Sequence, residues 1–438
     1  FSFLGELSNS GLDFHARGKF KDAFSCYEMT VQISEQLVGF GHYEFQDILL
    51  PSVNNLGALL RAMGRHEEAK ARYEQALEIR ETLLASDPEN AQYQGNVAGT
   101  SNNLGALLYA MGRHEESKAR YEQALAMYET LLASDKDNAQ YQSTVATTRN
   151  NLGALLRAMG RLKESRARYE QALAMRETLL ASDPENAQYR SDVAGTRNNL
   201  GALLRAMGRL EESRTRYEQA LAMRETLLAS DPENAQYRSD VAGTRNNLGA
   251  LLHAMGRHEE AKAGYEQALA IYETLLASDP ENAQYRSNVA TTRNNLGNLL
   301  SAMGRHEKAK AIYERALVVR ENLLALDKDN AQYRSDVATT RNNLGNLLSA
   351  MGRFEEARAL YEQALARREN LLALDKDNAQ YRSDVATTRN NLGNLLSAMG
   401  RFEEAKAIYE PALAMRETLP ASDKDNAQYP FFGDFIKG

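Results

Sequence analysis

The sequence is poor in the residues that cross-link or interrupt a chain. Its 438 residues include one cysteine, Cys26, and eight prolines. A single thiol cannot form an internal disulfide bond, and so few prolines are compatible with long helices. No run approaches the roughly 18 apolar residues that a membrane-spanning helix requires. With 43% hydrophobic and 25% charged residues, the composition predicts a chain that folds around an apolar core rather than a disordered one.

Basic charge is also scarce. The chain has 52 lysines and arginines against 59 aspartates and glutamates, which gives a formal net charge of −7. A nucleic-acid-binding protein needs a basic face that neutralises phosphates. Neither the total nor any block of this sequence supplies such a face, so we expect no nucleic-acid partner.

Motifs for catalysis and metal binding are missing as well. His66 and Glu67 begin like a zinc-protease helix, but Lys70 stands where the second histidine is required. Residues 135–138 begin like a calcium loop, but Ala139 follows where an oxygen ligand is needed, and helix capping explains the segment better. The sequence has no glycine-rich nucleotide-binding loop and no serine-hydrolase motif. We therefore expect no enzymatic activity, no cofactor and no metal.

What the sequence contains instead is a repeat. The tetrapeptide Asn-Asn-Leu-Gly begins at Asn54 and returns every 48 residues up to Asn390. Self-similarity at a fixed period of this length is the signature of a repeat architecture, in which each unit buries its apolar face against the next.

Apolar residues at steps of three and four predict two amphipathic helices in each unit. In one copy the helices cover about residues 232–255 and 259–277. Asp231 is predicted to cap the first of them, with Pro232 as its first helical residue. Gly256 is predicted to end it in a left-handed conformation.

The unit resembles the tetratricopeptide repeat (TPR). Leu200 and Gly201 match the Leu-Gly pair of that signature, Tyr217 matches its later aromatic residue, and Pro232 matches its closing proline. Two features depart from it: Arg197 stands where the family has tryptophan, and the period is 48 rather than 34. The added length is one heptad in each helix, which shifts the apolar stripe by only about 20°.

The resemblance implies an all-α fold, a right-handed superhelical solenoid of about nine antiparallel helix hairpins with unusually long helices. Residues 1–53 are predicted to form a divergent N-terminal repeat or cap, and residues 54–389 seven regular repeats. Residues 390–429 form a truncated last repeat, followed by an aromatic tail at 430–438.

The resemblance also implies that the first helix of each pair lines a concave side that recognises peptides or proteins. Asn198, Ala202 and Arg205 are spaced so that they share one open helix face. The repeat therefore predicts a ladder of asparagines that could hold an extended peptide backbone. Its members are Asn54, Asn102, Asn150, Asn198, Asn246, Asn294, Asn342 and Asn390. The alternative is that these amides only hold neighbouring helices together.

The open face changes along the array. Its early half carries cations and its late half carries serines at the matching position. The cations of the predicted binding face are Arg61, Arg157 and Arg205. An acidic partner is therefore predicted to prefer the early half.

The two ends of the chain differ from its body, because ten of the twelve phenylalanines lie outside the regular repeats. Pro411 and Pro420 are predicted to interrupt the last helix, which would leave its apolar face partly uncovered. The residues expected to mediate self-association are Phe1, Phe3, Leu4, Leu7, Tyr409, Leu413, Leu419, Phe431, Phe432 and Phe435. A head-to-tail contact of this kind produces an open fibre by default.

Two functions follow from these patterns. The favoured one is a non-catalytic scaffold that associates end to end into a homopolymer, and the other is a monomeric adaptor that binds peptides or proteins in its concave groove. The compartment stays open: cytoplasmic, or extracellular if a targeting segment preceded Phe1 and was removed.

Overall fold

The structure, a computed structural model, describes residues 2–376 and 378–417, and in that part of the chain every regular element is helical. Nine helices are the first members of hairpins: α1 (Ser2–Ala16), α3 (Gln46–Ala62), α5 (Ala91–Ala110), α7 (Ala139–Ala158), α9 (Ala187–Ala206), α11 (Ala235–Ala254), α13 (Ala283–Ala302), α15 (Ala331–Ala350) and α17 (Ala379–Ala398). Nine are second members: α2 (Phe20–Gly39), α4 (His66–Ser86), α6 (His114–Ser134), α8 (Leu162–Ser182), α10 (Leu210–Ser230), α12 (His258–Ser278), α14 (His306–Leu326), α16 (Phe354–Leu374) and α18 (Phe402–Glu417). A 3-10 turn, η1 (Tyr43–Phe45), precedes α3.

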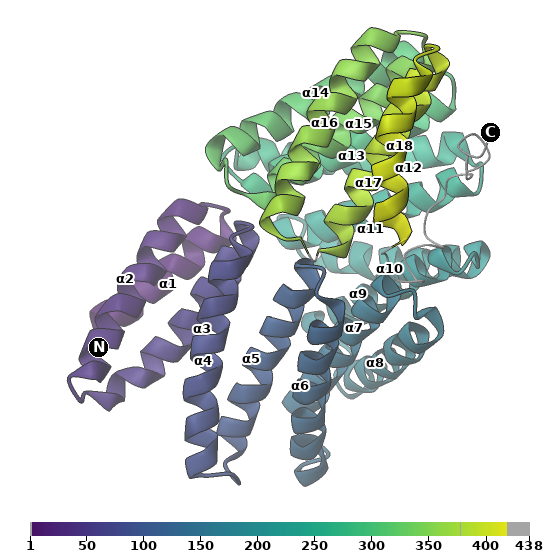
Figure 1. The fold of residues 1–438 in the computed structure, drawn as a ribbon. Helices are drawn as coiled ribbons and strands as arrows, with labels where there is room; N and C mark the ends of the chain where they lie inside the picture. Colours follow the sequence, from purple (N-terminus) through teal and green to yellow (C-terminus); the bar gives the residue numbers. More distant parts are fainter. Residues whose placement is uncertain (1, 377, 418–438) are drawn as a thin grey trace.

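The helices stack as nine antiparallel hairpins in chain order (Figure 1). Each helix packs against the one before it and the one after it, so the apolar core runs along the whole array. The expected all-α solenoid of about nine hairpins is thereby confirmed. The repeating tetrapeptide lies inside the first helices, because Asn54 falls within α3, so the sequence unit is offset from the structural hairpin by half a helix. No helix among the described residues is long and apolar enough to span a bilayer.

A glycine on each first helix lets the two helices of a hairpin approach closely. The ring of Tyr217, on α10, is almost fully buried and lies flat against Gly201 of α9. A methyl group on Gly201 would lie 2.9 Å from two carbon atoms of that ring. The divergent first hairpin has the same pair, Gly11 and Tyr27. The Leu-Gly pair is therefore a packing requirement of every hairpin.

The helix ends confirm one prediction and correct another. Gly256 follows α11 with φ +74°, as expected for a left-handed helix end. The predicted start of α11 was wrong by three residues, because Asn234 is the cap: its Oδ1 accepts from the backbone N–H groups of Gln236 at 3.1 Å and Tyr237 at 3.2 Å. Asp231 instead follows the end of α10, and the proline after it lies in the turn.

Arginine replaces the tryptophan of the family signature by making polar contacts between hairpins. Arg197 of α9 donates to Oε1 of Glu177, on the preceding hairpin, at 2.8 Å and to the sulfur of Met223 at 3.2 Å. A second arginine, Arg176 of α8, is only 7% exposed and donates to Thr196 Oγ1 at 2.6 Å. Hairpins are therefore joined by hydrogen bonds and ion pairs as well as by apolar packing.

The array curves until its first hairpins touch later ones. In Figure 1 helices α1–α4 lie beside the ends of α13–α16. The turn at Gly64 abuts Asn330 and Ala331, and the turn at Gly112 abuts Asn378. Phe20 of α2 packs against the apolar cluster formed by α13, α14 and α15. These contacts between successive superhelical turns are called the inter-turn contact below.

Candidate binding groove on the concave face

The first helices form the inner layer of the curve. Each first helix directly contacts the first helices of the neighbouring hairpins, although a second helix lies between them in the sequence. The most regular link is a hydrogen bond between asparagines: Nδ2 of Asn199 donates to Oδ1 of Asn150 at 3.1 Å, and Nδ2 of Asn247 donates to Oδ1 of Asn198 at 3.1 Å. The same bond recurs from Asn103 to Asn54, Asn151 to Asn102, Asn295 to Asn246, Asn343 to Asn294 and Asn391 to Asn342.

This pattern shows what the second asparagine of each unit does. It donates to the first asparagine of the preceding unit, so the amides hold neighbouring helices together, as the alternative interpretation expected. Asn294 and Asn342 are only 6% exposed, whereas the other six members of the ladder are half-buried. A binding role for the ladder is therefore left to those six half-buried amides.

A cavity of about 520 Å³ lies on this inner layer. It brings together the face predicted from the sequence spacing, because Asn198, Ala202 and Arg205 all line it. The corresponding residues of the next repeat also line it, including Asn246 and His253. The volume lies within the range of about 300–1,000 Å³ that is typical of ligand sites.

Tyrosine hydroxyls reach this face from the second helices, and the sequence did not reveal them as surface groups. Tyr217 and Tyr265 line the cavity although both are only 2% exposed. Burial raises the pKa of Tyr217, while Arg205 and Arg157 lower it. Burial likewise raises the pKa of Tyr169 to about 12, against the lowering effect of the nearby Arg157. The arginines of the early half thus lie directly beside buried hydroxyls.

The late half satisfies the same hydroxyls differently. The hydroxyl of Tyr361 donates to Oδ1 of Asn346 at 2.6 Å, and Tyr313 makes the same bond to Asn298. These asparagines stand where the early repeats have alanine. The change from alanine and arginine to asparagine and serine therefore replaces a cationic neighbour of the hydroxyl with a neutral one.

The residues predicted to mediate self-association lie at the two ends. Phe3 is 61% exposed on α1, while Leu4 is buried and Leu7 is half-buried. On α18, Tyr409 and Leu413 are half-buried. Phe1, Leu419, Phe431, Phe432 and Phe435 lie outside the described residues, as does Pro420.

The last described helix corrects one prediction about this end. Pro411 lies inside α18, which continues from Phe402 to Glu417. The prediction that Pro411 interrupts this helix was therefore wrong. Its fixed φ suits helical geometry, and the loss of one backbone hydrogen bond is tolerated within a packed hairpin.

Groups that could carry chemistry are sparse in the described residues. No three of their histidine, cysteine, aspartate and glutamate side chains gather where a metal ion could bind. Burial, and secondarily Asp22, raises the pKa of the Cys26 thiol. A raised pKa keeps the thiol in its less nucleophilic protonated form.

Comparison with known proteins agrees with this architecture. A family profile described as tetratricopeptide repeat matches residues 47–130, 96–178, 192–273, 240–322, 288–370 and 336–418. Together these matches cover well over half of the chain. A search of curated proteins by sequence gives no match.

Several solved structures share the fold. A Rap protein complexed with Competence and Sporulation Factor has a TM-score of 0.52 at 14% identity, with 96% of this chain and 99% of that one covered. Aspartyl phosphate phosphatase F from Bacillus subtilis has a TM-score of 0.52 at 13% identity, with 94% of each chain covered. The Rap conjugation gene regulator of the plasmid pLS20, in complex with the Phr* peptide, has a TM-score of 0.50 at 16% identity, with 86% and 97% covered. At these identities the likeness concerns the fold alone.

Proposed function

This chain belongs to the tetratricopeptide repeat family, and we propose that it is a protein-interaction scaffold that binds an extended acidic segment of a partner in its concave groove. The cavity of about 520 Å³ between α7, α9, α11 and α13 is the observation that carries the proposal. It lies on the inner layer of first helices, to which α3 with Arg61 also belongs.

The charge of the groove supports an acidic partner. Many arginines of the second helices are paired with glutamates of their own hairpin, as Arg214 is with Glu218 at 2.7 Å. In the described residues Arg61 and Arg205 have no carboxylate within ion-pair distance, and Arg205 is exposed at the cavity. An unpaired guanidinium on a groove wall favours a ligand that brings its own carboxylates.

The proposal can be tested with a fluorescein-labelled octaglutamate peptide and the full chain in fluorescence anisotropy. We expect the triple variant R61S, R157S and R205S, which copies the serines of the late half, to bind at least about tenfold more weakly. We also expect affinity for the unsubstituted chain to fall as salt is raised. The matched control changes Arg120, Arg168 and Arg216 to serine on the second helices, which removes the same charge elsewhere. Equal affinities of the two triple variants would contradict the proposal.

A second candidate function is self-association through the ends. It is supported by the exposed ring of Phe3 at one end and by the half-buried Tyr409 and Leu413 at the other. We expect sedimentation coefficients that rise with concentration, and that stay at the monomer value in F3E, because a buried carboxylate at the junction is costly. A monomer at every concentration for the unsubstituted chain would rule this function out.

We also propose that the chain is not an enzyme. The name of the Bacillus phosphatase describes that protein, and its 13% identity carries only the fold. We expect the full chain to release phosphate from acetyl phosphate no faster than buffer does. Faster release that scales with protein concentration would contradict this proposal.

A further inference from the structure

One arginine breaks the repeat pattern on the outer side of the array. Arg367 of α16 stands where the other copies have an apolar residue. The copies are Ile79, Met127, Met175, Met223, Ile271, Val319 and Met415. In the hairpin of Met223, the sulfur accepts a hydrogen bond from Arg197 at 3.2 Å. In the hairpin of Arg367 the equivalent arginine, Arg341, therefore faces another cation.

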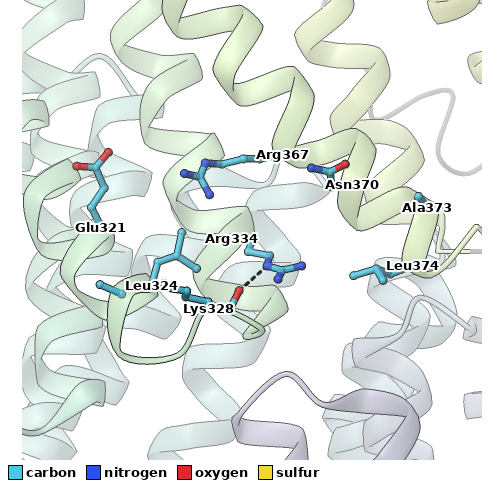
Figure 2. A pocket seen from close by; sticks show the side chains of 9 residues that line it. Glu321, Leu324, Lys328, Arg334, Arg367, Asn370, Ala373 and Leu374 are labelled. Carbon is cyan, nitrogen blue, oxygen red and sulfur yellow. Dashed lines mark hydrogen bonds between the residues drawn. The ribbon is translucent and has the colours of Figure 1, made fainter.

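Arg367 lies at a cavity of about 740 Å³ between the end of α14, the start of α15 and the end of α16. Figure 2 shows its guanidinium directed toward the side of the cavity where Glu321 lies. Lys328 and Arg334 lie on the floor of the cavity, where Nε of Arg334 donates to the backbone oxygen of Lys328 at 2.6 Å. We call this cavity the Arg367 pocket.

The carboxylates nearest to the pocket are already paired. Glu321 accepts from Arg341 at 2.6 Å, and Asp329 accepts from Arg334 at 2.9 Å. No carboxylate of the described residues lies within ion-pair distance of Arg367. Burial lowers the pKa of Arg367, and the like charges of Arg341 and Arg334 lower it further, whereas Glu321 raises it. Three cations therefore line the pocket, Lys328, Arg334 and Arg367, against one carboxylate, Glu321.

The edge of the pocket formed by the end of α16 is apolar and exposed. Leu374 lines the pocket and is 70% exposed, and Ala373 lies on the same stretch of α16, whereas the buried Leu324 lies on the other side of Arg334. Five earlier repeats have serine at the position of Leu374. These are Ser86, Ser134, Ser182, Ser230 and Ser278. Two exchanges on the same helix, one to arginine and one to leucine, therefore give this pocket a cation beside an apolar edge.

We propose that the Arg367 pocket is a second docking site, which binds a carboxylate side chain of a partner protein with an adjacent apolar side chain seated on Leu374. Burying part of an unpaired guanidinium is unfavourable for the chain alone, and a partner's carboxylate offsets that penalty through charge-assisted hydrogen bonds. The site lies on second helices and hairpin ends, away from the concave groove. It therefore stands whether or not the groove binds a peptide.

The preceding repeat is a built-in comparison. At the corresponding positions it has Val319 in place of Arg367 and Pro280 in place of Lys328, while Arg286 keeps the role of Arg334 by donating to the backbone oxygen of Pro280 at 2.7 Å. The hydrogen bond from the arginine to the loop backbone is thus the same in both repeats, whereas the cations Lys328 and Arg367 belong to the later repeat alone. The variant R367V gives this position the valine of the preceding repeat, a side chain that the fold already accommodates there.

The experiment uses a fluorescein-labelled peptide of alternating glutamate and leucine, with a lysine and leucine peptide as the charge control. Anisotropy is measured on the full chain carrying R61S, R157S and R205S, so that the arginines of the groove are absent. In that background we expect R367V to weaken binding of the acidic peptide at least about tenfold and L374S to weaken it less. The lysine peptide should not bind measurably. Unchanged affinity in R367V, or equal binding of the two peptides, would overturn the proposal.

A melting curve separates binding from folding. Because R367V removes a guanidinium crowded by two others, we expect its melting temperature to equal or exceed that of the parent chain. A lower melting temperature would show that Arg367 stabilises the hairpin, and that result would also overturn the proposal. Equal affinities of the two triple variants in the groove assay would contradict the groove proposal alone. The test of the Arg367 pocket is made without the arginines of the groove, so its result does not depend on that assay.

Discussion

Two glycines in equivalent turns allow the inter-turn contact to be tested without changing anything else. Gly64 follows α3 with φ +71°, and Gly208 follows α9 with φ +73°. At Gly64 an added methyl group would lie 2.6 Å from the backbone nitrogen of Ala331, whereas at Gly208 nothing lies within 4 Å. The variants G64A and G208A therefore introduce the same local strain, but only G64A pushes against another part of the chain.

The magnitudes follow from this difference. An alanine in the left-handed conformation costs about 1–2 kcal/mol in either turn. At Gly64 the obstructing atom belongs to the backbone, so no side chain can rotate away, and overpacking of this kind costs a further ~1–3 kcal/mol. The chain avoids that cost if the two superhelical turns move apart at the inter-turn contact. Asn330, which is fully buried in the contact, would then be exposed to water.

The assay is hydrogen exchange read at the loop and first turn of α15, together with the radius of gyration from small-angle X-ray scattering. We expect G64A to speed exchange at Asn330 and Tyr333 and to increase the radius of gyration. G208A should leave both unchanged, although its own turn is strained. Identical exchange and equal radii for the two variants would refute the inter-turn contact, because the local strain alone is common to both.

Three further outcomes are expected. Burial raises the pKa of Tyr169 to about 12, so between pH 10 and 12 the folded chain keeps the phenol proton that an unfolded chain releases. The free energy of unfolding should therefore fall as pH rises through that window. Circular dichroism and tyrosinate absorbance can follow this loss. G201A places a methyl group 2.9 Å from the ring of Tyr217 and should cost ~1–3 kcal/mol in urea unfolding, and a loss below 0.5 kcal/mol would refute the close packing. N247L removes the donor to Asn198 and should cost about 1 kcal/mol by the same measurement, whereas an unchanged midpoint would show that the asparagine ladder contributes nothing to stability.

The fold was predictable because each structural requirement is repeated many times in the sequence. Gly201 and Tyr217 recur as a pair in every regular hairpin, so the spacing reports a contact rather than a local preference. The helix cap was mispredicted because both Asp231 and Asn234 suit the role, and sequence cannot tell which backbone groups need an acceptor. Asn234 caps α11 because it precedes the first helical residue, whereas Asp231 ends the helix before.

The inter-turn contact could not be predicted, because the residues that make it are the same as residues that do not. Asn330 is fully buried in the contact, yet Asn186 has the same role as a cap and is half-buried. Whether two turns touch depends on the curvature summed over several hairpins, and no single repeat contains that information. The one local sign is Phe20, which packs across the gap where regular repeats have histidine, leucine or phenylalanine at the same helix start.

The groove connects the stability of the fold with its charge. Each hairpin packs a tyrosine ring against its glycine, and the ring carries a hydroxyl to the concave side, where it needs a polar neighbour. The early repeats supply arginine, as Arg157 does for Tyr169, and the late repeats supply asparagine, as Asn346 does for Tyr361. Both residues give the tyrosine hydroxyl a polar neighbour, but only arginine leaves a positive charge facing the groove. The charge gradient along the groove is therefore free to vary without cost to the core, and this freedom lets an array of near-identical hairpins present a different surface at each end.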